Sequence, residues 1–253
     1  MKKIKTLLYS LCMVMLLYAC SDDDSLSSSN TRIIALETNN QLFTVINLMN
    51  PDSSNQERTL SLLEAGLQKT MIKQDGFVSS SLHMSLDNSY IINYAQWESE
   101  NHLQAAADLV NSGGAPNMGE AFSLSNPDYH PFILTAQYKS SGVSPIIDTE
   151  GELLTIINVL QPLEGVTQEE LLSLLMKAIQ EEVLIQEGFV SATLHQSMDN
   201  DYIINYAQWE DEAALNGMVE RLEAGNAPKL GMVFSKSKPD FHPFRVIKSF
   251  FSE

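Results

Sequence analysis

Cysteine is almost absent from this chain. Among 253 residues there are two, Cys12 and Cys20, and both lie within residues 1–20. Everything that follows is therefore free of thiols, which excludes disulfide bonds, cysteine nucleophiles and thiolate metal sites from the folded part of the protein. We accordingly expect no metal centre of the paired-cysteine type.

Basic residues are also scarce. Lys and Arg total 15 against 32 Asp and Glu, so the formal net charge is −17 at pH 7. A surface this acidic repels nucleic acid and anionic lipid headgroups, and we expect no nucleic-acid partner. The chain also lacks a Gly-rich phosphate loop, a His-Glu-x-x-His motif and a Gly-x-Ser-x-Gly motif, so these chemistries are not indicated.

The chain has no apolar run long enough to span a membrane. Three lysines precede an uncharged stretch, residues 6–19, that is shorter than the ~20 residues of a spanning helix and is typical of a secretory signal peptide. Leu17-Tyr18-Ala19-Cys20 resembles a bacterial lipobox. We therefore expect residues 1–20 to be a lipoprotein signal with Cys20 lipidated, the alternatives being a plain secreted protein or a signal anchor.

The residues after Cys20 are acidic and polar. Ser21-Asp22-Asp23-Asp24 resembles the tags that direct some lipoproteins to the cell surface, although a solvated tether explains it equally. Residues 21–38 are predicted to be a flexible tether. The expected location is the cell envelope, at the outer membrane, with the lipid anchor as the protein's contact with the membrane.

One eight-residue string occurs twice. Ile-Ile-Asn-Tyr-Ala-Gln-Trp-Glu fills residues 91–98 and again residues 203–210, and further matches flank both copies. This period is too long for a solenoid, so it indicates a duplicated domain. We place the domains at residues 39–139 and 151–253, joined by a linker at residues 140–150.

Each copy changes its hydrophobic period in the same order. A β-branched strand is followed by an amphipathic helix, two strands joined by an Asp-Asn turn, a second helix and a last strand. This β-α-β-β-α-β order is the ferredoxin-like arrangement, an α+β fold with helices on one face of the sheet. The uncovered faces of the two sheets are predicted to pack together as an intramolecular pseudo-dimer.

Alternation along the repeated strand separates its side chains. Asn93, Ala95 and Trp97 should share one face, which leaves a gap beside an indole and an amide that suits a flat aromatic ligand. The neighbouring Tyr94 is a candidate substrate-binding residue, as is Tyr206 in the second copy. The plainer alternative is a buried core Trp and an Asn that serves only the local backbone.

These residues carry a family resemblance. Gly-Phe-Val-Ser, Leu-His, Asn-Tyr-Ala-Gln-Trp-Glu and a late His-Pro-Phe strand are similar to the antibiotic biosynthesis monooxygenase family, a branch of the dimeric α+β barrels, over residues 40–138 and 152–250. The resemblance implies a pocket between each sheet and its helices and cofactor-independent oxidation of anthrones or quinols to quinones. It assigns catalytic roles to Asn93, Trp97, Asn205 and Trp209.

Two features depart from the oxygenase branch. Where that branch uses a Tyr after the Trp and then an Arg, this chain has Leu103 and Asn117 in copy one, and leucine and lysine in copy two. A base would help such a reaction, and His83 and His195, on the neighbouring strand, are the candidates.

The heme-degrading branch of the family offers another interpretation. Asn47 and Asn158 match its first-strand Asn and are candidate substrate-binding residues, but no repeated His follows the Trp to serve as an axial ligand. We therefore expect an oxygenase of a small electron-rich aromatic, without a cofactor. The alternatives are a non-catalytic module that binds such a molecule at the cell envelope and, less favoured, heme binding or degradation.

Overall fold

The computed structural model describes residues 33–253 apart from 39–40, 148, 150 and 152. The expected signal peptide, Cys20 and residues 21–32 of the tether therefore lie outside the described residues. None of the helices within the described part of the chain has the length and apolar character needed to cross a membrane.

Two repeats with the same order of elements make up the folded body. The first contains β2 (Phe43–Met49), α2 (Gln56–Lys69), β3 (Phe77–Ser85), β4 (Ile91–Trp97), α3 (Glu100–Asn111), α4 (Pro116–Ser125) and β5 (Asp128–Lys139). The second contains β7 (Leu154–Pro162), α5 (Gln168–Ala178), β8 (Phe189–Ser197), β9 (Ile203–Trp209), α6 (Glu212–Glu223), α7 (Pro228–Ser235) and β10 (Ser237–Phe251). The predicted ferredoxin-like α+β fold is confirmed.

The prediction missed one helix in each repeat. The segments between the second helix and the last strand, for which the expected β-α-β-β-α-β order has no element, form α4 and α7, and each begins at a proline, Pro116 or Pro228. Proline suits the first helical position because its φ is preset and its missing N–H would have no intrahelical partner there. The Ala-Pro pair present in both repeats was the available signal for these helices.

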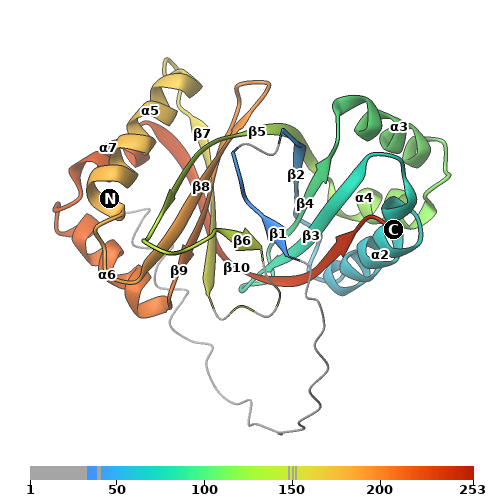
Figure 1. Ribbon diagram of the computed structural model, residues 1–253, viewed down its shortest axis with the longest axis horizontal. Helices are drawn as coiled ribbons and strands as arrows, with labels where there is room; N and C mark the ends of the chain where they lie inside the picture. Colours follow the sequence, from blue (N-terminus) through green and yellow to red (C-terminus); the bar gives the residue numbers. More distant parts are fainter. Residues whose placement is uncertain (1–32, 39–40, 148, 150, 152) are drawn as a thin grey trace, which may run out of the picture. The chain divides into compact units, whose positions relative to one another are not determined.

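The strands form one closed barrel in the order β10-β3-β4-β2-β5-β8-β9-β7. The last strand of each repeat connects the two halves. β5 pairs with β2 of its own repeat through residues 128–132 and with β8 of the other repeat through residues 132–139. β10 pairs in the same way, first with β7 and then with β3 (Figure 1). The expected pseudo-dimer is confirmed, with strands hydrogen-bonded across both seams.

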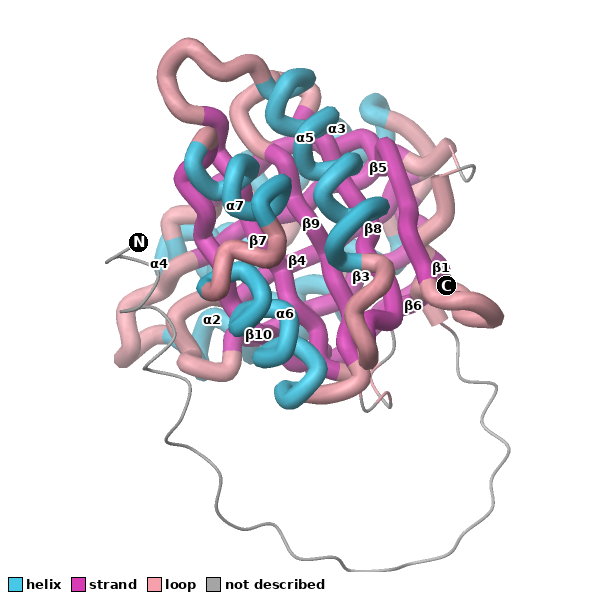
Figure 2. Tube along the Cα trace, turned by 90° about the vertical axis from the view of Figure 1, so that its left-hand side faces the viewer, coloured by secondary structure: helices cyan, strands magenta, loops and turns pink. Residues whose placement is uncertain are grey.

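The helices cover the outside of the barrel (Figure 2), and apolar side chains fill the space between the two sheets. This central core draws equivalent residues from both repeats, such as Ile92 with Ile204 and Tyr94 with Tyr206. Each repeat also has its own core between the sheet and its helices. Each sheet is thus buried on both faces, which explains why β4 is buried at all of its positions.

Two short strands add to the central core. β1 (Ile34–Ala35) pairs with β6 (Ile146–Ile147), and Ile34, Leu36 and Ile147 are at most 2% exposed. The tether prediction is therefore wrong for Ile34 to Leu36, and the linker prediction is wrong for residues 146–147. Both segments carry consecutive large apolar residues, whose burial contributes about 25 cal/mol per Å² and offsets the cost of ordering the chain.

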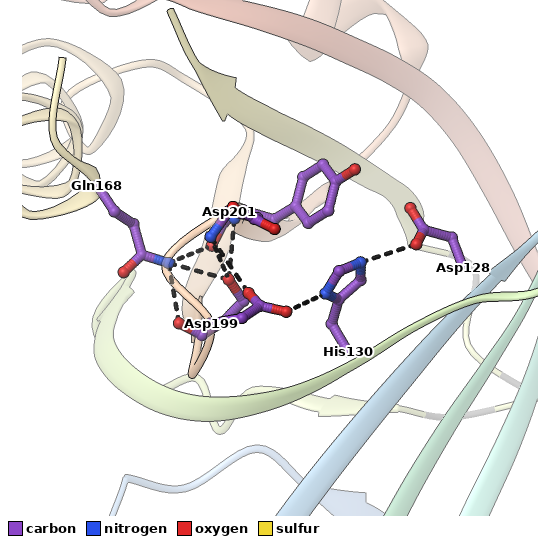
Figure 3. Close-up of polar contacts among 7 residues, drawn as sticks. Asp128, His130, Gln168, Asp199 and Asp201 are labelled. Carbon is purple, nitrogen blue, oxygen red and sulfur yellow. Dashed lines mark hydrogen bonds and ion pairs between the residues drawn. The ribbon is translucent and has the colours of Figure 1, made fainter. Parts of the chain in front are cut away.

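In each repeat a histidine of the last strand bonds to an aspartate in a hairpin turn of the other repeat, and we call this arrangement a histidine clasp. His130 of β5 bonds to Asp199 in the β8–β9 turn of the other repeat and, at 2.8 Å, to Asp128 (Figure 3). His242 of β10 bonds in the same way to Asp87, at 3.2 Å, and to Asp240, at 2.9 Å. Partial burial opposes protonation of His130, but the bonds to Asp199 and Asp128 outweigh it and raise its pKa.

Asp199→Asn is expected to lower stability most at mildly acidic pH. The pKa of His130 in the folded protein is raised above its usual 6.5. The protonated histidine therefore contributes its full stabilisation of the folded state below pH 6.5, and this contribution is lost as the pH rises through the folded pKa. Asp199 has a lowered pKa and stays ionised down to about pH 4. Urea titrations should show a loss of about 1 kcal/mol between pH 4 and 6.5 and less at pH 9. A loss that does not vary with pH would contradict an ionic clasp.

Candidate active site

The repeated strand β4 lines a cavity on the helix side of the first sheet. Asn93, Ala95 and Trp97 contribute to its wall, as the alternation along the strand predicts. Its volume is about 140 Å³. The remaining walls come from the other strands of the sheet and from helices α2, α3 and α4, and they are mostly apolar: Val45, Leu67, Met71, Phe77, Leu103, Ala106, Ala107, Val110, Met118 and Phe122.

Three polar side chains, one on each of three adjacent strands, form a row along the cavity wall. Asn93 on β4 lies opposite Asn47 on β2, and Asn47 lies opposite Tyr129 on β5. All three residues line the cavity. Tyr129 is 46% exposed, whereas Asn47 and Asn93 are 6% and 4% exposed, so the row runs from the protein surface into the interior.

Hydrogen bonding orients Asn93. The hydroxyl of Ser80 on β3 donates to Asn93 Oδ1 at 2.5 Å. With the carbonyl oxygen engaged, the amide NH₂ of Asn93 is the group left to donate to a ligand. Ser80 is fully buried and pairs with Ala95, so it lies on the same face of the sheet as the cavity.

Two buried polar atoms of the cavity wall have no partner among the described residues. They are Asn47 Oδ1 and the indole Nε1 of Trp97. Leaving a buried polar group unpaired costs about 1–3 kcal/mol, so a ligand or water that reached these atoms would lower the free energy by bonding to them. Together with the Asn93 amide, the site offers two N–H donors and one acceptor within an apolar enclosure.

Tyr129 is a site residue that the sequence analysis missed. Among the described residues that line the cavity, it alone carries a titratable side chain. Burial, with a smaller contribution from Glu100, raises its pKa, so it remains a neutral phenol at physiological pH. The available signal was that Tyr129 stands where the second repeat has Phe241.

The predicted base is in the wrong place. His83 pairs with Ile92 and therefore lies on the barrel-interior face of the sheet, opposite to Asn93. Its Nε2 is 3.1 Å from the hydroxyl of Tyr206, and burial lowers its pKa to about 4. His195 has the same environment, with its Nε2 3.0 Å from Tyr94 Oη and its pKa lowered to about 4. The assignment of His83 and His195 as bases is corrected, because neither side chain lines the cavity.

The predicted contact of Tyr94 and Tyr206 with substrate is corrected for the same reason. Both tyrosines are 1% exposed within the central core, with ring centroids 6.5 Å apart. Burial raises the pKa of both phenols and lowers the pKa of their histidine partners, so each pair is neutral. Through these bonds the tyrosines link the two repeats, and they lie on the face of the sheet opposite to the cavity.

Ser80→Ala is expected to lower kcat about 3- to 10-fold while KM changes little, if the cavity is catalytic. The variant removes one hydrogen bond, worth about 1 kcal/mol, and frees the Asn93 amide to rotate away from the reacting oxygen. Ser81→Ala is the matched control, because Ser81 pairs with Tyr94 on the interior face. Ser80→Thr should restore the rate. Equal effects of the two alanine variants on kcat would contradict a positioning role for Ser80.

The second repeat presents Asn205, Trp209 and Asn158 in equivalent positions. Asn158 lies opposite Asn205 and Leu154 opposite Trp209, as their counterparts do in the first repeat. The edge of Phe189 packs on Trp209 at 5.4 Å between ring centroids, and Phe77 packs on Trp97 at 5.2 Å. Both repeats therefore keep the framework of one site, and they differ in the side chains around it.

A family model describes this framework. Residues 154–223 match the model of the antibiotic biosynthesis monooxygenases. Residues 154–223 are therefore similar to an antibiotic biosynthesis monooxygenase domain. A relative from Streptomyces glaucescens, tetracenomycin-F1 monooxygenase, is 37% identical over 75 residues, which is 28% of this chain. The match spans 63% of the length of that relative.

Solved structures share the fold over most of the chain. An anthrone oxidase-like protein superposes with a TM-score of 0.70 at 18% identity, covering 87% of this chain and 97% of the other. A protein of Fusobacterium nucleatum, described as a monooxygenase, superposes with a TM-score of 0.54 at 9% identity, covering 83% and 94%. At these identities the likeness concerns the fold alone.

No histidine lines the cavity within the described part of the chain. His102, the one histidine that follows Trp97 closely, bonds instead to Ser99 at 3.1 Å on the surface turn that begins α3. In the described residues no three or more His, Cys, Asp or Glu side chains gather as a metal ion would require. The donor set of this cavity therefore fits an organic ligand with hydroxyl groups better than an axially ligated heme.

Proposed function

We propose that the protein is a cofactor-independent monooxygenase of a small electron-rich aromatic hydroxyl compound, acting in the cavity of Asn93 and Trp97. The observation that carries the proposal is the oriented Asn93 amide beside an unpaired indole N–H in an apolar enclosure. The family of the second repeat and the partial relative named as a monooxygenase support it.

The reaction needs no reductant beyond the substrate. The aromatic hydroxyl loses its proton, and the resulting anion transfers an electron to dioxygen. The radical pair combines at a ring carbon that bears hydrogen. Loss of water from this hydroperoxide leaves one oxygen atom as a quinone oxygen, while the other leaves with the ring hydrogen and the hydroxyl proton. The substrate supplies all four electrons that dioxygen accepts.

Side chains of the cavity stabilise the deprotonated substrate. The Asn93 NH₂ and Trp97 Nε1–H donate to the developing oxyanion, and such preorganised donors act strongly where water is excluded. Phe77, Leu103, Met118 and their neighbours keep the reactive intermediates from solvent. Tyr129, which is half-exposed, offers the proton a route to bulk water.

We expect kcat/KM to rise with pH and to level off near the pKa of the substrate hydroxyl. Among the described residues, no carboxylate or imidazole lines the cavity to act as a base, so the ionised fraction of the substrate controls the rate. Phenols of graded acidity, assayed by oxygen uptake from pH 5 to 9, should give profiles displaced in step with their own pKa values. One shared inflection for all substrates would instead reveal a titrating residue of the protein.

The test of the proposed function is oxygen consumption by the full-length chain with phenols, catechols, hydroquinones and anthrones. Labelled dioxygen should place one heavy atom in the quinone product and one in water. Uptake above the spontaneous rate with this labelling supports a monooxygenase. Label only in hydrogen peroxide would indicate an oxidase and would contradict the proposal.

A ligand-binding module is the second candidate. It is favoured by Leu103, which lines the cavity where the oxygenase branch is expected to use a tyrosine. For such a module, Trp fluorescence and calorimetry would report binding of an aromatic hydroxyl compound, and no panel member would be consumed. This outcome would support the cavity as a binding site and refute the proposed oxygenase activity.

A further inference from the structure

The two repeats differ in the space beside the conserved Asn and Trp. Ala106 and Ala107 line the cavity of the first repeat, and α6 of the second repeat carries Met218 and Val219 at the matching positions. Met218 is 4% exposed and belongs to the same apolar cluster as Trp209. The second repeat therefore carries larger side chains at the positions where alanines line the first cavity.

The orienting hydroxyl is also missing from the second repeat. Ser80 pairs with Ala95, and its counterpart that pairs with Ala207 is Ala192. Asn205 Oδ1 consequently has no partner among the described residues, whereas Asn93 Oδ1 accepts from Ser80. Asn205 is thus left without the hydrogen bond that aims the Asn93 amide.

The polar row is shorter in the second repeat. The strand partner of Asn47 is Tyr129, and the strand partner of Asn158 is Phe241. The second repeat therefore lacks the half-exposed phenol at the surface end of the row. Three independent positions thus differ in the same direction, toward larger and less polar side chains in the second repeat.

The first cavity is small. Its volume is about 140 Å³, and an enclosed apolar cavity of about 150 Å³ holds one benzene ring. One substituted ring fills this space, whereas a three-ring anthrone would have to extend out of the open end beside Tyr129. The unpaired acceptor Asn47 Oδ1 lies beside the donor Asn93 on the adjacent strand, so two neighbouring oxygens on one ring can meet both.

We infer that the chain has one working pocket, in the first repeat, and that its ligand class is the monocyclic catechols. One catechol oxygen accepts from Asn93 and Trp97, and the adjacent hydroxyl donates to Asn47 Oδ1. Ala106 sets the space for the ring, and Met218 closes the second pocket. The inference rests on the proposed function for the chemistry and on the cavity alone for binding.

The test is calorimetric titration of the full-length chain with catechol and with a dihydroxyanthrone, in the absence of oxygen so that no turnover occurs. We expect one catechol per chain and weaker or undetectable binding of the anthrone. Ala106→Met should weaken catechol binding at least about 30-fold, because the added side chain takes the place of the ring. The reciprocal Met218→Ala should leave affinity at the first site within about twofold.

Folding of the variants is checked by thermal unfolding. Ala106→Met places its side chain in existing space, so its Tm should be at or above that of the wild type. Two catechols per wild-type chain, unchanged binding by a folded Ala106→Met variant, no catechol binding, or tighter binding of the anthrone would each overturn the inference.

Failure of the inference and failure of the proposed function are distinguishable. If one catechol binds per chain but is not consumed in air, the single pocket is supported and the proposed oxygenase activity is refuted. Anthrone that is consumed in an Asn93-dependent reaction, without catechol binding, supports the oxygenase and overturns the inference.

Discussion

Replacing Asn93 by Ala is expected to lower kcat for a phenolic substrate by about 100- to 1,000-fold. The amide is oriented by Ser80 and lies in an enclosure with almost no polar competition, so its N–H donor acts on the oxyanion at low local dielectric. The donor strengthens its bond as charge develops, and KM should therefore change less than kcat. Initial rates of oxygen uptake would measure the effect.

The second repeat supplies a matched control for this prediction. Asn205→Ala makes the same change within an identical strand sequence, in the repeat where Met218 stands at the position of Ala106. Its kcat should stay within about twofold of the wild type. If Asn205→Ala were as damaging as Asn93→Ala while both variants fold normally, the first repeat would not be the sole site of reaction.

Acidification from pH 7 to pH 4 is expected to remove several kcal/mol of stability. His83 and His195 are fully buried, and burial lowers the pKa of each from 6.5 to about 4. In the unfolded chain they would titrate near pH 6.5, so between pH 6.5 and 4 the unfolded state binds more protons than the native state. Each histidine then contributes a loss of about 3 kcal/mol by pH 4.

Urea midpoints measured at intervals between pH 7 and 4 would show this loss as a falling free energy of unfolding. His83→Gln is the informative variant, because an amide can still accept from Tyr206 but does not titrate. It should remove about half of the loss. The clasp histidines do not mask the effect, since their raised pKa keeps their contribution constant below pH 6.5. An unchanged acid slope in His83→Gln would refute this assignment.

Several features of the site followed from local pattern. Alternation placed Asn93 and Trp97 on one face of β4 and Tyr94 on the other, and the structure has them so. Hydrophobic periodicity gave the order of strands and the principal helices. These features depend on neighbours in sequence, which is the information that a single chain provides most directly.

Other features depend on pairing between distant strands. His83 lies next to β4 in its sheet, but its face is set by the register with Ile92, and a shift of one residue would have turned it toward the cavity. The exchange of β5 and β10 between the sheets likewise requires knowledge of both partners. The second repeat differs from the first at single positions, of which Met218 is the most important. The effect of such a difference can be judged only when the cavity beside its counterpart, Ala106, is known.

The structure also explains why the Tyr and Gln of the repeated string are retained in both repeats. Tyr94 bonds to His195 and Tyr206 bonds to His83, so the tyrosine of each copy serves the other copy. Gln96 and Gln208 accept from serines of the neighbouring strands, at 2.9 and 2.8 Å. Retention of Tyr and Gln in the second repeat is therefore accounted for by the barrel, without a second working site.

The crossing of β10 has a consequence for how the chain folds. Residues 244–251 complete the barrel by pairing with residues 79–85, more than half of the chain away. Contacts of such separation are slow to form, and until they form the edge of β3 remains open to other chains. Removing the last residues would therefore leave the first repeat with an unprotected edge. We therefore expect the barrel to close last at β10, and aggregation of a truncated or incompletely synthesised chain to begin at β3.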